Sequence, residues 1–191
     1  DPSPSTDSPL AALVKDYPIQ SMNVVAHIRK ATQGDICLQN THPFQRELWG
    51  RYWVFAHNGN LIDFNPELSG RYLPVGNTDS ERAFCFLLDT LAQRFGATAP
   101  SYEHLMDTMA EVAAVLRAHG PANFLLSNGR WLIAHCSTDL HYVVRRAPFN
   151  QAHLKDEDVS IDFNEVTSET DCVTVIATTP LTDNEHWTRI E

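Results

Sequence analysis

The sequence contains no apolar run of the roughly 20 residues that a membrane-spanning helix needs. Basic residues are also scarce, because 14 Lys and Arg stand against 24 Asp and Glu, a net charge of −10. A chain of that charge repels nucleic-acid phosphates and anionic lipids, so we expect no nucleic acid and no membrane as partner. The N-terminus shows no signal-peptide pattern. We therefore expect a cytoplasmic protein.

Cysteine pairs of the C-x-x-C type are absent as well, and the four cysteines have no metal-type spacing. Cys85, Cys136 and Cys172 fall within apolar stretches, whereas Cys37 lies in a polar region. This pattern predicts reduced, buried thiols of an intracellular protein rather than disulfides.

The length of 191 residues and the hydrophobic share of 43% predict one domain, residues 1–191, with a sizeable core. Both ends look cut. The first ten residues are rich in Pro and Ser, and the last residues do not complete an element. We expect the domain to be truncated at the N-terminus and also at the C-terminus.

Local patterns predict three helices. Ser8 and Pro9 resemble a cap and first residue of a short helix over 10–17. Thr78 and Glu81 have capping-box spacing, with apolar residues at helical intervals up to a stop at Gly96. A further helix within 101–120 places four apolar side chains on one face: Leu105, Met109, Val112 and Leu116.

Strands are predicted on both sides of the two long helices. The apolar, β-branched stretches 22–28 and 52–57 precede them, and the long polar region 29–51 between these stretches is predicted to be an irregular loop. Residues 122–136 predict a hairpin with a two-residue turn at Asn128-Gly129. Strands 140–146 and 171–179 follow. This order indicates an α+β layered domain with mainly antiparallel sheet.

The sequence His57-Asn58-Gly59 ends a predicted strand and leaves two interpretations open. Asn-Gly is a strong turn signal, which favours a simple hairpin bend. Alternatively, the Asn58 side-chain amide and the Gly59 backbone N–H are two donors that could converge on a developing oxyanion.

Two charged residues also have a structural and a functional interpretation. Arg29 could be a surface arginine, or its planar guanidinium group could bind a carboxylate through two hydrogen bonds. Asp79 could compensate a helix dipole or bind an ammonium group. Taken together, they describe a clamp for an α-amino acid. With two oxyanion donors nearby, the pattern predicts acyl chemistry on an amino-acid side chain, as in glutamine or γ-glutamyl amides.

A metal site is the weaker alternative for the histidines. His27, His42 and His57 are spaced 15 residues apart, without the close pairs typical of zinc ligands. We therefore expect no metal and no cofactor, and interpret these histidines as loop-orienting hydrogen-bond partners. No cysteine or serine in the polar clusters lies beside an obvious base.

Five motifs in order resemble the class II glutamine amidotransferases, which are N-terminal-nucleophile (Ntn) hydrolases: HIRKATQG, NTHPF, AHNG, GNTDSE and NFLLSNG. The resemblance spans essentially the whole chain and is greatest to the stand-alone branch, which has no synthetase domain. It implies an αββα four-layer sandwich, two antiparallel sheets between helix layers, lacking its N-terminal segment here. It is compatible with a homo-oligomer.

The resemblance also implies roles for individual residues. Arg29 would bind the substrate α-carboxylate, with Thr32 in the same pocket wall, and Asp79 would bind the α-ammonium. Asn58 and Gly59 would form the oxyanion hole, with His57 as their structural neighbour.

The nucleophile would be an N-terminal cysteine that uses its own α-amine as base, and we expect it upstream of Asp1. The expected reaction is transfer or hydrolysis of the γ-glutamyl amide of glutamine or a γ-glutamyl small molecule. A non-catalytic amino-acid-binding regulatory module of the same fold, or a histidine–metal hydrolase, would be the alternatives.

Overall fold

The computed structural model describes residues 8–17, 19, 21–28, 35–156, 158–165 and 167–191. The chain divides into two compact units, residues 1–135 and 136–191. The predicted single domain over residues 1–191 stays a prediction. No helix in the described part of the chain combines the length and apolar character needed to cross a membrane.

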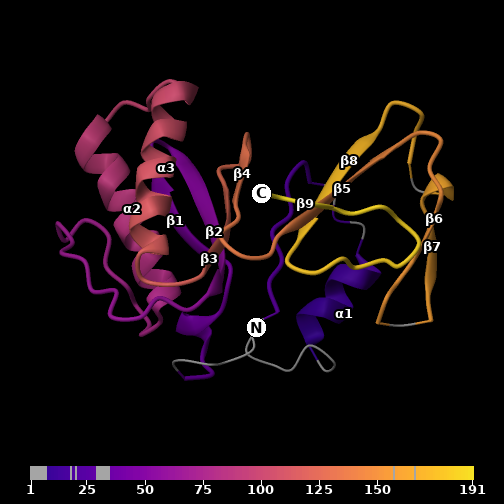
Figure 1. Ribbon diagram of the computed structural model, residues 1–191, viewed down its shortest axis with the longest axis horizontal. Helices are drawn as coiled ribbons and strands as arrows, with labels where there is room; N and C mark the ends of the chain where they lie inside the picture. Colours follow the sequence, from indigo (N-terminus) through magenta and orange to yellow (C-terminus); the bar gives the residue numbers. More distant parts are fainter. Residues whose placement is uncertain (1–7, 18, 20, 29–34, 157, 166) are drawn as a thin grey trace. The chain divides into compact units, whose positions relative to one another are not determined.

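The first unit is built on one four-stranded antiparallel sheet with strand order β1-β2-β3-β4. Figure 1 shows α2 and α3 side by side along one face of this sheet. Its elements are α1 (Pro9–Asp16), η2 (Leu38–Asn40), β1 (Phe44–Leu48), β2 (Arg51–Gly59), α2 (Asp79–Phe95), α3 (Tyr102–Arg117), β3 (Ala122–Ser127) and β4 (Leu132–His135).

The second unit holds a three-stranded antiparallel sheet of order β8-β5-β9 and a two-stranded sheet of β6 and β7. Its elements are β5 (His141–Arg146), β6 (Gln151–His153), β7 (Ser160–Asp162), η3 (Phe163–Glu165), β8 (Cys172–Ala177) and β9 (Thr188–Arg189). The predicted α+β class with antiparallel sheets is confirmed.

The core of the first unit lies between the sheet and the two helices. Successive side chains of a strand point to opposite faces, so Trp53, Phe55 and His57 of β2 all face the helices. Phe55 packs against Phe84 of α2 and Phe124 of β3, with ring centroids 5.2 Å and 5.5 Å away. The same alternation places Ala56 and Asn58 on the face opposite to α2 and α3, which we call the open face; Ala56 is buried there and Asn58 is exposed.

The predicted helices are confirmed with their caps. The Ser8 side chain accepts a hydrogen bond from the Ala11 N–H at the start of α1, and Pro9 is its first residue. Thr78 caps α2 by accepting from the Glu81 N–H at 3.2 Å, and Gly96 ends it with a φ of 62°. The four apolar residues predicted on one face of α3 are all buried.

One strand prediction and one loop prediction between residues 22 and 51 are wrong. Residues 22–28 are all described and none is in a strand; Met22, Val24 and Ile28 are exposed. Conversely, the region predicted to be irregular contains β1. Phe44 and Leu48 are buried on its inner face, but Arg46 lies between them on that face and interrupts the apolar alternation.

Of the two interpretations left open for Asn58-Gly59 the hairpin bend is wrong, and the two-residue turn predicted at Asn128-Gly129 is a longer loop. Asn58 and Gly59 belong to β2 and pair with Asn123 and Ala122 of β3, so this segment is not a hairpin bend. The hairpin of β3 and β4 is confirmed, but four residues connect the strands. Asn128 shapes this loop because its Oδ1 accepts the N–H groups of Arg130 and Trp131, both at 3.0 Å.

The cysteines are all free, but only Cys85 is buried. Cys136 is half-buried and Cys172 is exposed, contrary to the prediction for these two. Cys172 belongs to β8, an edge strand, where an apolar sequence does not guarantee cover.

Candidate functional site

The end of β2 presents neighbouring residues to two different environments. Asn58 is exposed on the open face, and its backbone carbonyl accepts a hydrogen bond from the Asn123 side chain at 3.3 Å. His57 points the other way and is buried beneath α2. The Asn58 carboxamide is therefore carried by a paired strand and remains accessible.

His57 is fixed at both ring nitrogens. Its Nδ1 lies 2.9 Å from the Ser80 hydroxyl and its Nε2 lies 3.3 Å from the Pro121 carbonyl oxygen. A neutral imidazole satisfies both contacts if Nε2–H donates to Pro121 and Nδ1 accepts from Ser80. Burial lowers the pKa of His57 below 6.5 and outweighs the opposing effect of the Asp79 carboxylate. His57 is therefore a neutral scaffold group at pH 7.

Gly59 is in close contact with Pro121, the residue before β3, and with His57. A Cβ at this position would overlap the Pro121 carbonyl oxygen and lie 2.7 Å from His57 Nε2. Neither neighbour is the end of a flexible side chain. The close approach of β2 to the residue that precedes β3 thus requires glycine.

Asp79 lies close to this strand end through a direct hydrogen bond. It is the first residue of α2, and its Oδ2 accepts the Leu61 N–H at 2.8 Å. Leu61 comes two residues after Gly59, so the structure brings Asp79 to the chain segment that leaves the Asn-Gly pair. Asp79 is half-buried, and its Oδ1 makes no hydrogen bond within the described residues.

The loop that leads into α2 is organised by a buried carboxylate. Glu81 accepts the N–H groups of Val75 and Gly76 at 3.1 Å and 2.7 Å, and it pairs with Arg46 of β1 at 2.6 Å. Its side chain is only 2% exposed. The predicted capping box is thus half formed: Thr78 binds the Glu81 N–H, but the Glu81 carboxylate binds the preceding loop.

Asn40 of the NTHPF motif fixes the next residue of that loop. Its Oδ1 accepts the Asn77 N–H at 3.0 Å, and its Nδ2 donates to Asn77 Oδ1 at 2.8 Å. The two motifs NTHPF and GNTDSE, which are separate in sequence, therefore meet at the N-terminus of α2.

The three histidines considered as metal ligands do not converge on one point. His27 and His42 stack, with ring centroids 4.2 Å apart, and His27 Nε2 is 3.1 Å from the His57 carbonyl oxygen. Both nitrogens of His57 face protein partners. Among the described residues, no group of three or more His, Cys, Asp or Glu side chains is arranged to hold a metal ion.

A hollow of about 420 Å³ lies elsewhere on the first unit. Tyr52 and Val54 of β2, Ser127 of β3 and Asn23 contribute to its lining. This part of β2 is the end opposite to Asn58, and none of the predicted site residues lines the hollow.

The model of the class II glutamine amidotransferase family matches residues 1–191. The chain belongs to this family. It is 54% identical over 190 residues to "Putative glutamine amidotransferase YafJ" of Escherichia coli (strain K12), covering 100% of this chain and 74% of the relative. It is 51% identical over 185 residues to a protein of Haemophilus influenzae with the name "Putative glutamine amidotransferase", covering 96% and 62%.

A solved structure also resembles this member of the class II family. It is the crystal structure of a predicted glutamine amidotransferase from Pseudomonas aeruginosa PA01, with a TM-score of 0.72 and 52% identity. The match covers 80% of this chain and 60% of that one. The chain thus spans 60 to 74% of the length of these three proteins.

The structure places four of the six predicted site residues of this amidotransferase chain. His57, Asn58 and Gly59 end β2 and Asp79 begins α2, but the Asn58 side chain lies on the opposite face of the sheet from His57. Arg29 and Thr32 lie outside the described residues. Sequence reasoning gave no role to Asn40, Ser80 or Pro121, although Asn40 belongs to a motif already quoted. Membership of that motif is the signal that the sequence offers for Asn40.

Neither Cys85 nor Cys37 resembles an activated nucleophile. Burial raises the pKa of Cys85 to about 11, which keeps the thiol protonated and less reactive at neutral pH. Cys37 lies immediately before η2, and no base contacts it within the described residues.

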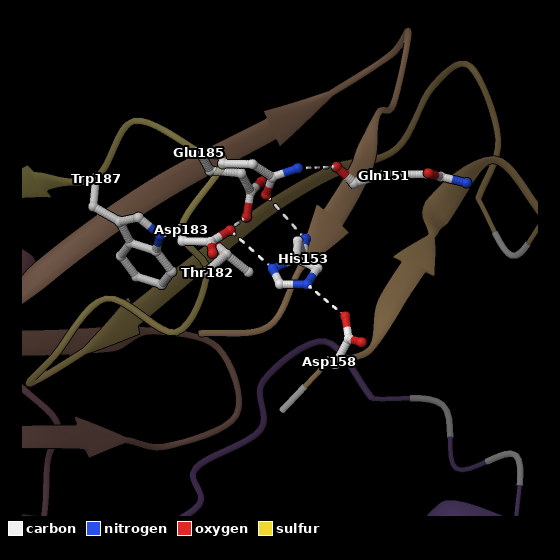
Figure 2. Close-up of polar contacts among 8 residues, drawn as sticks. Gln151, His153, Asp158, Thr182, Asp183, Glu185 and Trp187 are labelled. Atoms are coloured by element: carbon white, nitrogen blue, oxygen red, sulfur yellow. Dashed lines mark hydrogen bonds and ion pairs between the residues drawn. The ribbon is translucent and has the colours of Figure 1, made fainter. Parts of the chain in front are cut away.

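A separate polar cluster lies in the second unit. Figure 2 shows His153 between the carboxylates of Asp158 and Asp183, at 3.4 Å and 3.0 Å. Both carboxylates raise the pKa of His153 above 6.5. Arg145 holds Glu185 through two contacts of 2.7 Å and 2.6 Å and lowers the pKa of that carboxyl group. These groups pair with one another and stabilise the loop that follows β8.

Proposed function

We propose that this chain is the glutamine-hydrolysing part of a class II amidotransferase, acting on the γ-glutamyl amide of glutamine or a related γ-glutamyl small molecule. The main support is the hydrogen bond between Asp79 and the Leu61 N–H. It brings a carboxylate suited to an ammonium group close to a strand end with a carboxamide suited to an oxyanion.

The nucleophile in this proposal is an N-terminal cysteine upstream of Asp1 in the full-length protein. Its α-amine takes the thiol proton, and the thiolate attacks the γ-carbonyl carbon. Asn58 Nδ2 and the Gly59 N–H donate to the oxygen that becomes negative. The protonated α-amine returns its proton to the leaving nitrogen, so collapse of this intermediate expels ammonia and forms a γ-glutamyl thioester.

Water then attacks the thioester and releases glutamate, which restores the thiol. Throughout, the α-amino acid end of the substrate is held by the clamp. Arg29 binds the α-carboxylate, Thr32 belongs to the same wall and Asp79 binds the α-ammonium. His57 lies beneath the oxyanion donors and supports Gly59 through the Pro121 contact.

We also propose the Ntn-hydrolase αββα sandwich for the complete domain. The sheet of β1 to β4 has helices on one face, and its open face carries apolar or uncharged side chains such as Val54, Ala56 and Leu125. Such a face suits packing against a second sheet. Cytoplasmic location and homo-oligomer formation remain predictions from sequence.

A hydrolysis assay on the full-length protein tests the proposed function. We expect ammonia and glutamate to be released from L-glutamine, or the matching amine from a γ-glutamyl compound, at a rate unaffected by a metal chelator. Saturable binding of these compounds without release would favour the amino-acid-binding module. Loss of activity with the chelator, restored by Zn²⁺, would favour the metal hydrolase instead.

A further inference from the structure

The Asn40 side chain is polar, uncharged and almost completely buried. Asn40 is the last residue of η2 and is 1% exposed. Its Nδ2 donates to the Asp35 carbonyl at 2.9 Å and to Asn77 Oδ1 at 2.8 Å, and its Oδ1 accepts from the Asn77 N–H at 3.0 Å. The carboxamide therefore uses both donors and its acceptor.

The contact with Asn77 is reciprocal and tight. Asn40 binds both the backbone and the side chain of Asn77, so two hydrogen bonds fix the orientation of this residue. The preceding Gly76 also lies against Asn40, since a Cβ there would overlap Asn40 Oδ1. Little room remains for the loop to shift away from Asn40.

Asn77 lies two residues before Asp79, and only the cap residue Thr78 separates them. The direction in which the chain enters α2 therefore depends on Asn40 as well as on the cap. Asp79 is held at its Oδ2 by the Leu61 N–H. If the chain that enters α2 shifted, the Asp79 backbone would move, but the bond from the Leu61 N–H would still hold Oδ2. The carboxylate would therefore rotate, and Oδ1 would point in another direction.

We infer that Asn40 is a positioning residue for Asp79, and through it for recognition of the substrate's α-amino group; this rests on the proposed function. Asn40 does not contact the substrate. Its effect should be confined to substrates that carry the ammonium group, because the oxyanion donors on β2 have their own support from β3 and His57.

The test compares two substrates with the full-length protein. L-Glutamine carries the α-amino group, and glutaramate is the same molecule without it. For Asn40→Ala we expect the KM for L-glutamine to rise about tenfold with kcat changed less than about twofold, the pattern of lost uniform binding. The KM for glutaramate should change less than about twofold.

Asn77→Ala provides a milder version of the same change. Its side chain is exposed and only one bond of the pair with Asn40 is lost, so the variant should fold even if Asn40→Ala does not. We expect a rise of about threefold in the KM for L-glutamine alone. Asn164→Ala is the matched control, because it removes an asparagine–aspartate contact of 2.9 Å in the second unit and should change neither KM.

Equal losses on both substrates, or a loss confined to kcat, would show a merely structural role and overturn the inference. Unchanged kinetics in Asn40→Ala would overturn it as well. A wild-type protein that hydrolyses neither substrate would overturn the proposed function, and the inference with it. An active wild type with equal effects on both substrates overturns the inference alone.

Discussion

Asn58→Ala is expected to lower kcat for glutamine hydrolysis by about 10²–10³, the usual effect of losing one oxyanion donor. Asn58 is exposed on the open face of the sheet, and its backbone pairing with Asn123 does not depend on the side chain. The KM should change little, because the donor acts on charge that develops only in the transition state. Steady-state kinetics of ammonia release measures both constants.

Asn58→Asp separates the loss of a donor from the loss of volume. The carboxylate has nearly the same shape but cannot donate, and its charge repels an oxyanion. We expect kcat to fall at least as far as in Asn58→Ala. Both variants should keep the wild-type free energy of unfolding within about 0.5 kcal/mol, as is usual for exposed positions. A turnover close to wild type in either variant would remove Asn58 from the oxyanion hole.

Gly59→Ala is expected to damage both the fold and the activity. The added Cβ would overlap the Pro121 carbonyl oxygen and press on His57 Nε2. Overpacking of this kind typically costs 1–3 kcal/mol, and we expect the upper part of that range because a backbone atom and a buried ring must move. Displacing the donors should lower kcat by about 10²-fold.

The adjacent Asn58→Ala serves as the matched control for Gly59→Ala. Both changes introduce alanine on the same strand, but only the new Cβ at position 59 overlaps a backbone atom and a buried ring. Urea denaturation should show a loss of about 2–3 kcal/mol for Gly59→Ala and almost none for Asn58→Ala. Equal stability of the two variants would mean that β2 does not approach Pro121 as described.

The elements that could be predicted from sequence are those that local residues determine. α2 and α3 follow from apolar residues at helical spacing and from the caps at Thr78 and Gly96. By contrast, β1 was missed because Arg46 faces inward, and only the distant Glu81 makes that position favourable. Asn58-Gly59 has the sequence of a turn, but pairing with β3 keeps it in a strand.

The sequence motifs singled out Asn58, Gly59 and Asp79, and the roles of these residues stay a prediction. The structure places Asn58 and Gly59 at the end of β2 and Asp79 at the start of α2, where it binds the Leu61 N–H. The bond from Leu61 to Asp79 and the bonds from Asn40 to Asn77 could not be predicted, because they join segments that fold back on one another. Buried polar residues such as these carry no periodic signal.

The most direct measurement is covalent trapping of the full-length protein with a diazoketone analogue of L-glutamine, followed by peptide mass spectrometry. We expect one equivalent of label on a cysteine that precedes Asp1, with loss of glutamine hydrolysis in proportion and protection by glutamine. Label on Cys37 or another internal residue, or full activity after complete labelling, would contradict the proposed N-terminal cysteine and its thioester.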